Sequence, residues 1–140
     1  SLKNNEAIEI RSPHAIRPWQ HVLEPLRGYL LLVSKQYQDP QRYIGAWNFG
    51  PDEGSIVNVG ELVDTLISKW GSGSWIDSSD KNQPHEAKLL KLDISKVRYK
   101  LGWKPKLNFD ETMDLLVDWY LQDKVDYDFD VKQIKKYLES

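Results

Sequence analysis

The chain has 140 residues, enough for one small domain with a single core. Hydrophobic residues make up 40% and charged residues 29%, which is typical of a soluble globular protein. The net charge of −2 argues against a general nucleic-acid-binding protein, and the lack of cysteine excludes disulfides, thiol catalysis and thiolate zinc sites. No apolar run reaches the roughly 20 residues that span a bilayer, and no secretory signal is visible, so a cytoplasmic location is expected.

The first half of the chain predicts two helices and several short strands. Residues 7–10 predict a strand, and Ser12-Pro13-His14 predicts a turn. Apolar residues at helical spacing predict a helix over about residues 22–37, which ends at Asp39-Pro40. Residues 46–49 predict a short apolar strand before the breaker cluster at 50–54.

Capping signals place the remaining helices. Asn58 and Glu61 fit a capping box before a helix that ends at Gly71-Ser72-Gly73, and Asn108 with Glu111 repeats the pattern. Asp93 is predicted to cap a short helix that ends at Gly102. The remaining predicted elements are a strand over 74–76, a polar loop over 77–83, a strand over 89–92 and a last helix over 131–138 of undefined docking. The apolar helical faces that contain Trp70 and Trp119 are predicted to be buried in the core. This mixture predicts an α/β lobe of α+β character, in which short strands pack with four or five helices.

Residues 16–19 predict an extended strip that is a candidate binding element. Pro18 fixes its own φ and disfavours the helical region for Arg17. Side chains alternate in such a strip, so Arg17 and Trp19 share one face. The guanidinium of Arg17 is a planar fork of donors suited to a phosphate, whereas the structural alternative is a surface ion pair.

Several catalytic motifs are missing from the sequence. There is no Gly-x-Gly-x-x-Gly loop, no Gly-x-x-x-x-Gly-Lys loop and no Gly-x-Ser-x-Gly elbow. The three histidines are isolated from one another in sequence. The residues themselves therefore predict a lobe that binds a ligand and lacks chemical machinery of its own, with neither a metal nor a bound cofactor expected.

Four blocks of the sequence resemble CDP-glucose 4,6-dehydratases, members of the extended short-chain dehydrogenase/reductase superfamily. The blocks are Ile16-Arg17-Pro18-Trp19-Gln20-His21-Val22-Leu23-Glu24-Pro25-Leu26 with Gly28-Tyr29-Leu30-Leu31, then Ala46-Trp47-Asn48-Phe49-Gly50-Pro51, then Pro84-His85-Glu86-Ala87 with Leu90-Lys91-Leu92-Asp93, and finally Ser95-Lys96 through Pro105 with Trp119-Tyr120. The last block is shared by many nucleotide-sugar enzymes, whereas the first and third are more specific.

The resemblance implies that the whole chain, residues 1–140, is the carboxyl-terminal substrate-binding lobe, with a flexible start over 1–6 and a tail over 122–140. Family members carry the NAD glycine loop and a catalytic Tyr-Lys pair in a Rossmann half, which the resemblance implies lies outside this sequence. No catalytic residue is therefore expected here. The intact enzyme would turn CDP-glucose into CDP-4-keto-6-deoxyglucose and water in the cytoplasm, as a homodimer or tetramer, for deoxysugar and O-antigen synthesis. Another nucleotide-sugar dehydratase or epimerase, or a non-catalytic binding module, is the alternative.

The resemblance also implies roles in the first block. Arg17 would hold the pyrophosphate of the nucleotide sugar. Trp19 would pack beneath the strip or stack on the base. Gln20 would read the base or ribose, or would be an exposed amide, and His21 would be a packing residue.

In the later blocks, Asn48 would touch the nucleotide or tie down the Gly50-Pro51 turn. His85 and Glu86 would lie over the substrate nucleotide or form a solvated charge pair, and Lys88 is a weaker candidate for the phosphates. Loops held by a rigid frame commonly carry binding residues.

Overall fold

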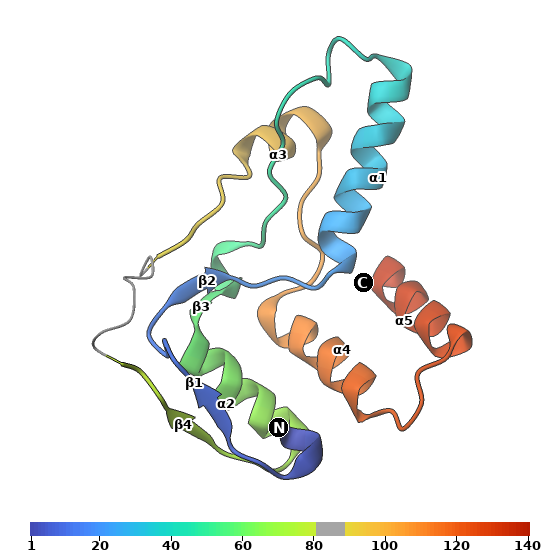
Figure 1. Cartoon of the computed structure of the whole chain (residues 1–140). Coiled ribbons are helices and arrows are strands. Elements are labelled where there is room, and N and C mark those ends of the chain that lie inside the picture. The colour runs from blue at the N-terminus through green and yellow to red at the C-terminus, as the bar shows by residue number, and fades with distance from the viewer. Residues whose placement is uncertain (81–88) are drawn as a thin grey trace.

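The computed structural model describes residues 1–80 and 89–140, in which short strands are interspersed among helices up to residue 77 and helices alone follow (Figure 1). In chain order the elements are a 3₁₀ turn over Leu2–Asn4, β1 (Ile8–Ile10), β2 (Ile16–Pro18), α1 (Leu23–Gln38), a 3₁₀ turn over Glu53–Ser55, β3 (Ile56–Asn58), α2 (Val59–Trp70), β4 (Trp75–Asp77), α3 (Ser95–Leu101), α4 (Phe109–Leu121) and α5 (Tyr127–Glu139). The predicted mixed α/β class is confirmed. No helix in this described part of the chain is long and apolar enough to cross a membrane.

The strands form two separate pairs. β1 runs parallel to β4, with Ile8 opposite Trp75, and β2 runs antiparallel to β3, with Pro18 opposite Ile56. Pro18 has no N–H to donate, and it sits at the end of a two-stranded ladder where this loss is tolerated. The extended conformation predicted for Arg17 and Pro18 is therefore confirmed as a strand.

Both predicted capping boxes and the predicted end of α3 at Gly102 are confirmed, whereas the predicted cap at Asp93 is wrong, because the N-cap of α3 is Ile94 and makes no side-chain capping bond. In both capping boxes the asparagine Oδ1 accepts a hydrogen bond from the glutamate N–H three residues on, at 2.8 Å for Asn58 and 2.9 Å for Asn108. At the other end of α3, Gly102 adopts a left-handed φ of 66°, which costs a glycine little. These local signals fix where α2, α3 and α4 begin or end.

Two predicted strands are wrong. Residues 46–49 form no ladder within the described chain; instead, Lys96 Nζ donates to the Ala46 carbonyl at 2.6 Å and Gln20 Nε2 donates to the Phe49 carbonyl at 3.0 Å. Residues 89–92 contribute a single bridge, from Leu89 to Ile16, before the chain continues toward α3. In both cases the apolar pattern is present, but no continuous ladder with a second strand forms within the described chain.

The last helix is longer than predicted and is firmly docked. α5 begins at Tyr127 because Asp126 caps it, accepting from the Phe129 N–H at 3.0 Å. Gln133 Nε2 donates to the Leu115 carbonyl of α4 at 2.9 Å. The prediction of Trp119 as core is wrong, because its side chain is 38% exposed and its indole N–H donates to Asp130 at the rim of α5.

The buried side chains form two clusters. One joins the aromatic rings of Phe49 and Trp103, whose centroids lie 5.1 Å apart, to Tyr43, Val97 and Leu101. The other contains Leu107, Leu115 and Tyr137, with Leu23 of α1 packed against it. The second cluster explains the docking of α5, since it buries Tyr137 between α4 and the start of α1.

A buried carboxylate connects α1, the 106–107 segment and α5. Glu24 is 1% exposed, and its Oε1 accepts hydrogen bonds from the backbone N–H groups of Lys106 and Leu107 at 2.7 and 2.8 Å. The Tyr137 hydroxyl donates to Glu24 Oε2 at 2.8 Å and accepts from Arg27 Nε at 2.8 Å. Figure 1 shows the carboxyl end of α5 beside the start of α1, where this network lies. The network satisfies the buried charge, as burial of a carboxylate requires.

The phenol in this network makes stability sensitive to alkali. Burial raises the pKa of Tyr137 to about 12, with the Glu24 carboxylate adding to the rise and Arg27 opposing it. A folded-state pKa above the unfolded value of about 10 gives stability that is complete below pH 10 and is lost as the pH rises through 12. We therefore expect the stability advantage of the native chain over Tyr137→Phe to shrink between pH 10 and pH 12, measured by urea unfolding across that range. An advantage that stays constant would show that the phenol is not held in this way.

Candidate functional site

The β2 strip holds Arg17 and Trp19 in fixed positions. Arg17 is partly buried opposite Val57 in the β2–β3 ladder, and its Nη1 donates to the Ile16 carbonyl at 2.9 Å. Trp19 continues the ladder with an N–H to the Ser55 carbonyl, and its indole N–H donates to the Val57 carbonyl, both at 3.1 Å. Trp19 therefore packs onto β3, as its packing alternative predicts, and it helps to immobilise the backbone of Arg17.

The next two residues connect the strip to α1 and to the core. Gln20 is partly buried rather than exposed; its Nε2 binds the Phe49 carbonyl, while its Oε1 is buried and has no hydrogen-bond partner within the described residues. His21 accepts the Leu23 N–H on Nδ1 at 3.3 Å. Burial lowers the pKa of His21, although Glu24 partly offsets this effect, so the neutral ring that can accept this bond is favoured.

Asn48 lies exposed on the segment before the Gly50-Pro51 turn. Its Nδ2 donates to the Asp93 carbonyl at 3.3 Å, which links this segment to the approach to α3. His85, Glu86 and Lys88 lie outside the described residues. Leu89 bridges to Ile16 in a parallel sense, and the Leu90 N–H donates to the Ile16 carbonyl at 3.2 Å.

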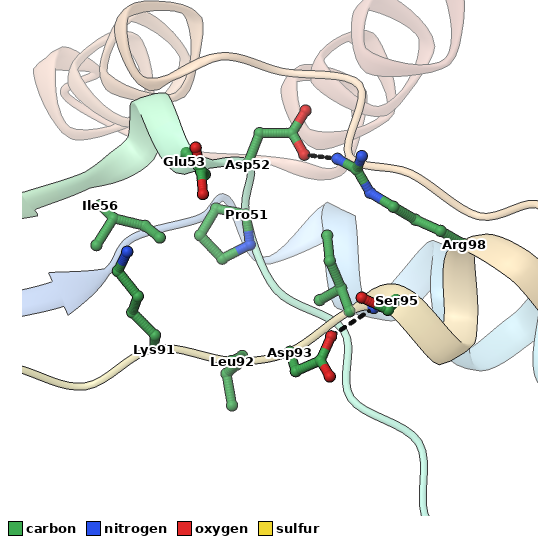
Figure 2. A pocket seen from close by; sticks show the side chains of 10 residues that line it. Pro51, Asp52, Glu53, Ile56, Lys91, Leu92, Asp93, Ser95 and Arg98 are labelled. Carbon is green, nitrogen blue, oxygen red and sulfur yellow. Dashed lines mark hydrogen bonds and ion pairs between the residues drawn. The ribbon is translucent and has the colours of Figure 1, made fainter.

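A pocket of about 490 Å³ lies beside this region, between the turn after Gly50 and the approach to α3 (Figure 2). One wall comes from the 51–56 segment and the other from the 91–98 segment. Its lining residues are Pro51, Asp52, Glu53, Ile56, Lys91, Leu92, Asp93, Ile94, Ser95 and Arg98. The pocket is therefore built from segments about 40 residues apart in sequence.

Some charged side chains of the pocket have partners within the lobe and others do not. Arg98 and Asp52, which both line the pocket, form an ion pair (Figure 2). Asp93 Oδ1 accepts the Ser95 N–H at 2.8 Å, and hydrogen bonds from Ser95 lower the pKa of Asp93, so this carboxylate is ionised at neutral pH. Glu53 and Lys91 line the same pocket (Figure 2), and their side chains make no hydrogen bond or ion pair to any residue in 1–80 or 89–140. They are thus available to a ligand.

Of the predicted site residues, Arg17, Gln20 and Asn48 lie within the described chain, and none of the three lines this pocket. Gln20 and Asn48 bind backbone carbonyls that flank its two walls, at Phe49 and Asp93. Pro18 lies opposite the lining residue Ile56, while Arg17 lies opposite Val57. Successive residues of a strand point to opposite faces, so Arg17 and the Ile56 side of the pocket lie on different faces of the ladder.

Sequence reasoning missed the pocket residues. The 50–54 cluster was recognisable as a chain breaker, but no local pattern indicates that Asp52 meets Arg98, 46 residues later. Within the described part of the chain, no group of three histidine, aspartate or glutamate side chains lies close enough to hold a metal ion.

Comparison with known proteins shows that the chain is similar in sequence to enzymes that act on nucleotide sugars. It is 42% identical over 121 residues to the CDP-glucose 4,6-dehydratase of Salmonella typhimurium, across 86% of this chain and 33% of that enzyme. It is 24% identical to the dTDP-glucose 4,6-dehydratase of Shigella flexneri across 76% of this chain and 29% of that protein, and 25% identical to UDP-glucuronic acid decarboxylase 1 of Xenopus tropicalis across 86% and 26%. No protein-family model matches the chain.

These matches confirm the resemblance read from the four sequence blocks. The chain is homologous to the carboxyl-terminal part of CDP-glucose 4,6-dehydratase, and it spans about a third of the length of the curated relatives that it matches.

Proposed function

We propose that this chain is the substrate-binding lobe of a CDP-glucose 4,6-dehydratase, which converts CDP-glucose to CDP-4-keto-6-deoxyglucose with loss of water. One observation carries the proposal. Identity to the CDP-glucose enzyme is 42%, whereas identity to a dTDP-glucose enzyme that catalyses the corresponding reaction is 24%. The similarity thus favours the CDP-glucose branch among the nucleotide-sugar enzymes.

Arg17 is proposed to hold the pyrophosphate of the nucleotide. A guanidinium binds phosphate oxygens through short, charge-assisted and often bidentate hydrogen bonds. The Arg17 backbone is held in the β2–β3 ladder, so the residue is positioned before the ligand arrives. Gln20, Asn48, His85 and Glu86 are proposed as further contacts, by the same resemblance.

The pocket beside β2 is not assigned to the nucleotide sugar, because Arg17 and the Ile56 wall of the pocket lie on opposite faces of the β2–β3 ladder.

The cofactor does not fit this chain. NAD supplies a transient oxidation of the sugar in the related enzymes, but the sequence has no glycine-rich phosphate loop. Tyr120 and Lys124 have the Tyr-x-x-x-Lys spacing, but α4 ends at Leu121, so they do not lie on one helix. The proposed task of the chain is therefore to bind and orient the nucleotide sugar and to close one wall of the cleft against water. In the intact enzyme, NAD would be held by the Rossmann half, and a cytoplasmic homodimer or tetramer is proposed.

Activity measurements test whether this chain binds the substrate while the chemistry resides in the Rossmann half. We expect the purified chain, supplied with NAD and CDP-glucose, to form no 4-keto product. We expect a chimera that joins the remaining two thirds of the Salmonella enzyme to this chain to form that product, and to prefer CDP-glucose over dTDP-glucose and UDP-glucose. Turnover by the chain alone would overturn the division.

The chimera also separates the alternatives. A chimera that prefers dTDP-glucose or UDP-glucose would assign the lobe to another nucleotide-sugar dehydratase or epimerase, as the weaker relatives allow. A chimera that binds CDP-glucose without converting it would favour a non-catalytic binding module.

A further inference from the structure

The segment that carries Asn48 has no regular structure to hold it in place. Within residues 1–80 and 89–140, no backbone-to-backbone hydrogen bond fixes residues 44–49. Asn48 itself is exposed, so burial does not immobilise its side chain. The position of this amide therefore depends on side-chain contacts between the segment and other parts of the lobe.

Lys96, in the first turn of α3, contacts the segment directly before Asn48. Its Nζ donates to the Ala46 carbonyl at 2.6 Å and lies 4.1 Å from the centroid of the Trp47 ring. A charged donor strengthens a hydrogen bond, and among aromatic rings an indole attracts an ammonium most strongly. One cation therefore holds the backbone of Ala46 and the ring of Trp47, the two residues that precede Asn48.

Asn48 makes a hydrogen bond in the opposite direction. Its Nδ2 donates to the carbonyl of Asp93, three residues before Lys96, at 3.3 Å. The indole N–H of Trp47 donates to the Tyr43 carbonyl at 3.0 Å, which holds the ring that Lys96 contacts. The 46–48 segment and the start of α3 thus exchange hydrogen bonds on both sides of Asn48.

These contacts leave part of the Asn48 amide available to a ligand. An asparagine side chain has two N–H donors and one carbonyl acceptor, and the Asp93 carbonyl uses one N–H. The other N–H and the Oδ1 atom have no partner within the described residues. The amide therefore presents one donor and one acceptor in an orientation that the lobe sets.

We infer that Lys96 is a positioning residue for Asn48, which it orients toward the nucleotide sugar before that ligand arrives. Lys96 acts through Ala46 and Trp47 rather than by touching the ligand. A binding group that is already held in its bound orientation loses less conformational entropy when the ligand binds. This inference rests on the proposed function, since it explains how one of the proposed nucleotide contacts is oriented.

A double-mutant cycle between Lys96 and Asn48 tests the inference, by calorimetric titration of the chain with CDP. We expect Lys96→Met and Asn48→Ala each to weaken CDP binding by about 10-fold, the order of loss expected for one hydrogen bond. Because Lys96 acts through Asn48, the double variant should bind no more weakly than Asn48→Ala alone. Lys96→Arg should retain most of the affinity, because a guanidinium can both donate to the carbonyl and stack on the Trp47 ring.

Lys100→Met is the matched control for the loss of charge. Lys100 lies one turn further along α3, is exposed, and its side chain makes no hydrogen bond or ion pair within the described residues, so this variant should bind CDP like the native chain. The side-chain amide resonances of Asn48, measured by NMR without ligand, give a second readout. They should shift in Lys96→Met and stay unchanged in Lys100→Met.

Independent losses would make the double variant about 100-fold weaker than the native chain, and this result would overturn the inference. Equal weakening by Lys96→Met and Lys100→Met, or unchanged Asn48 amide resonances in Lys96→Met, would overturn it as well. A native chain that binds no CDP, but in which Lys96→Met still shifts those resonances, would leave the positioning of Asn48 intact and refute the proposed nucleotide-binding role.

Discussion

Glu24→Ala is expected to destabilise the chain by about 4 kcal/mol, the largest effect of any single substitution that we predict. The substitution removes the acceptor for two backbone N–H groups and for the Tyr137 hydroxyl, which are then left without partners in a buried site. It also releases α5 from α1 and from the 106–107 segment. A loss of this size is a large share of the 5–15 kcal/mol that is typical of a folded domain.

Urea unfolding followed by circular dichroism measures this loss. Glu24→Gln should cost about half as much, because the amide oxygen still accepts the two N–H groups while the charge-assisted bond to Tyr137 is lost. Glu139→Ala is the control, since Glu139 is exposed at the end of α5 and should change the free energy of unfolding by less than about 0.5 kcal/mol. Equal effects of Glu24→Ala and Glu139→Ala would refute the role of the network.

Arg17→Ala is expected to weaken CDP binding by about 100-fold, corresponding to about 3 kcal/mol of binding free energy. The alanine variant lacks the guanidinium that is proposed to hold the pyrophosphate. The β2–β3 ladder is made by backbone groups, so the substitution should leave the fold intact. Arg17→Lys should retain part of the affinity, because an ammonium supplies the charge without the planar fork of donors.

Calorimetric titration of the purified variants gives the affinities. Arg11→Ala is the matched control, because it removes an exposed arginine from the turn before β2 and the same unit of charge. If Arg11→Ala and Arg17→Ala weaken CDP binding equally, the effect is one of overall charge and Arg17 is not the anchor.

The local parts of this fold could be predicted from the sequence, since their causes are local. The capping boxes at Asn58 and Asn108 each act over three residues, and Gly102 ends α3 by its own conformational freedom. Pro18 restricts the backbone conformation of Arg17, so the extended strip could also be predicted from the sequence. In each case the interacting groups are neighbours along the chain.

The parts that failed depend on distant partners. Glu24 gives no sequence signal of burial, because it binds groups 82, 83 and 113 residues away. Residues 46–49 carry the apolar pattern of a strand, but a ladder needs a second strand, and none lies beside them in the described chain. The pocket likewise needs Asp52 to meet Arg98. The periodicity of α1 predicted a helix correctly, but periodicity cannot say whether its apolar face is covered or open.

The measurement that tests the central claim most directly is calorimetric titration of this chain with CDP, UDP and dTDP. Our account predicts that CDP binds more tightly than the other two nucleotides, since the chain is most similar in sequence to a CDP-glucose enzyme among the relatives compared. Equal binding of all three nucleotides, or tighter binding of UDP or dTDP, would contradict the assignment of this lobe to a CDP-glucose 4,6-dehydratase.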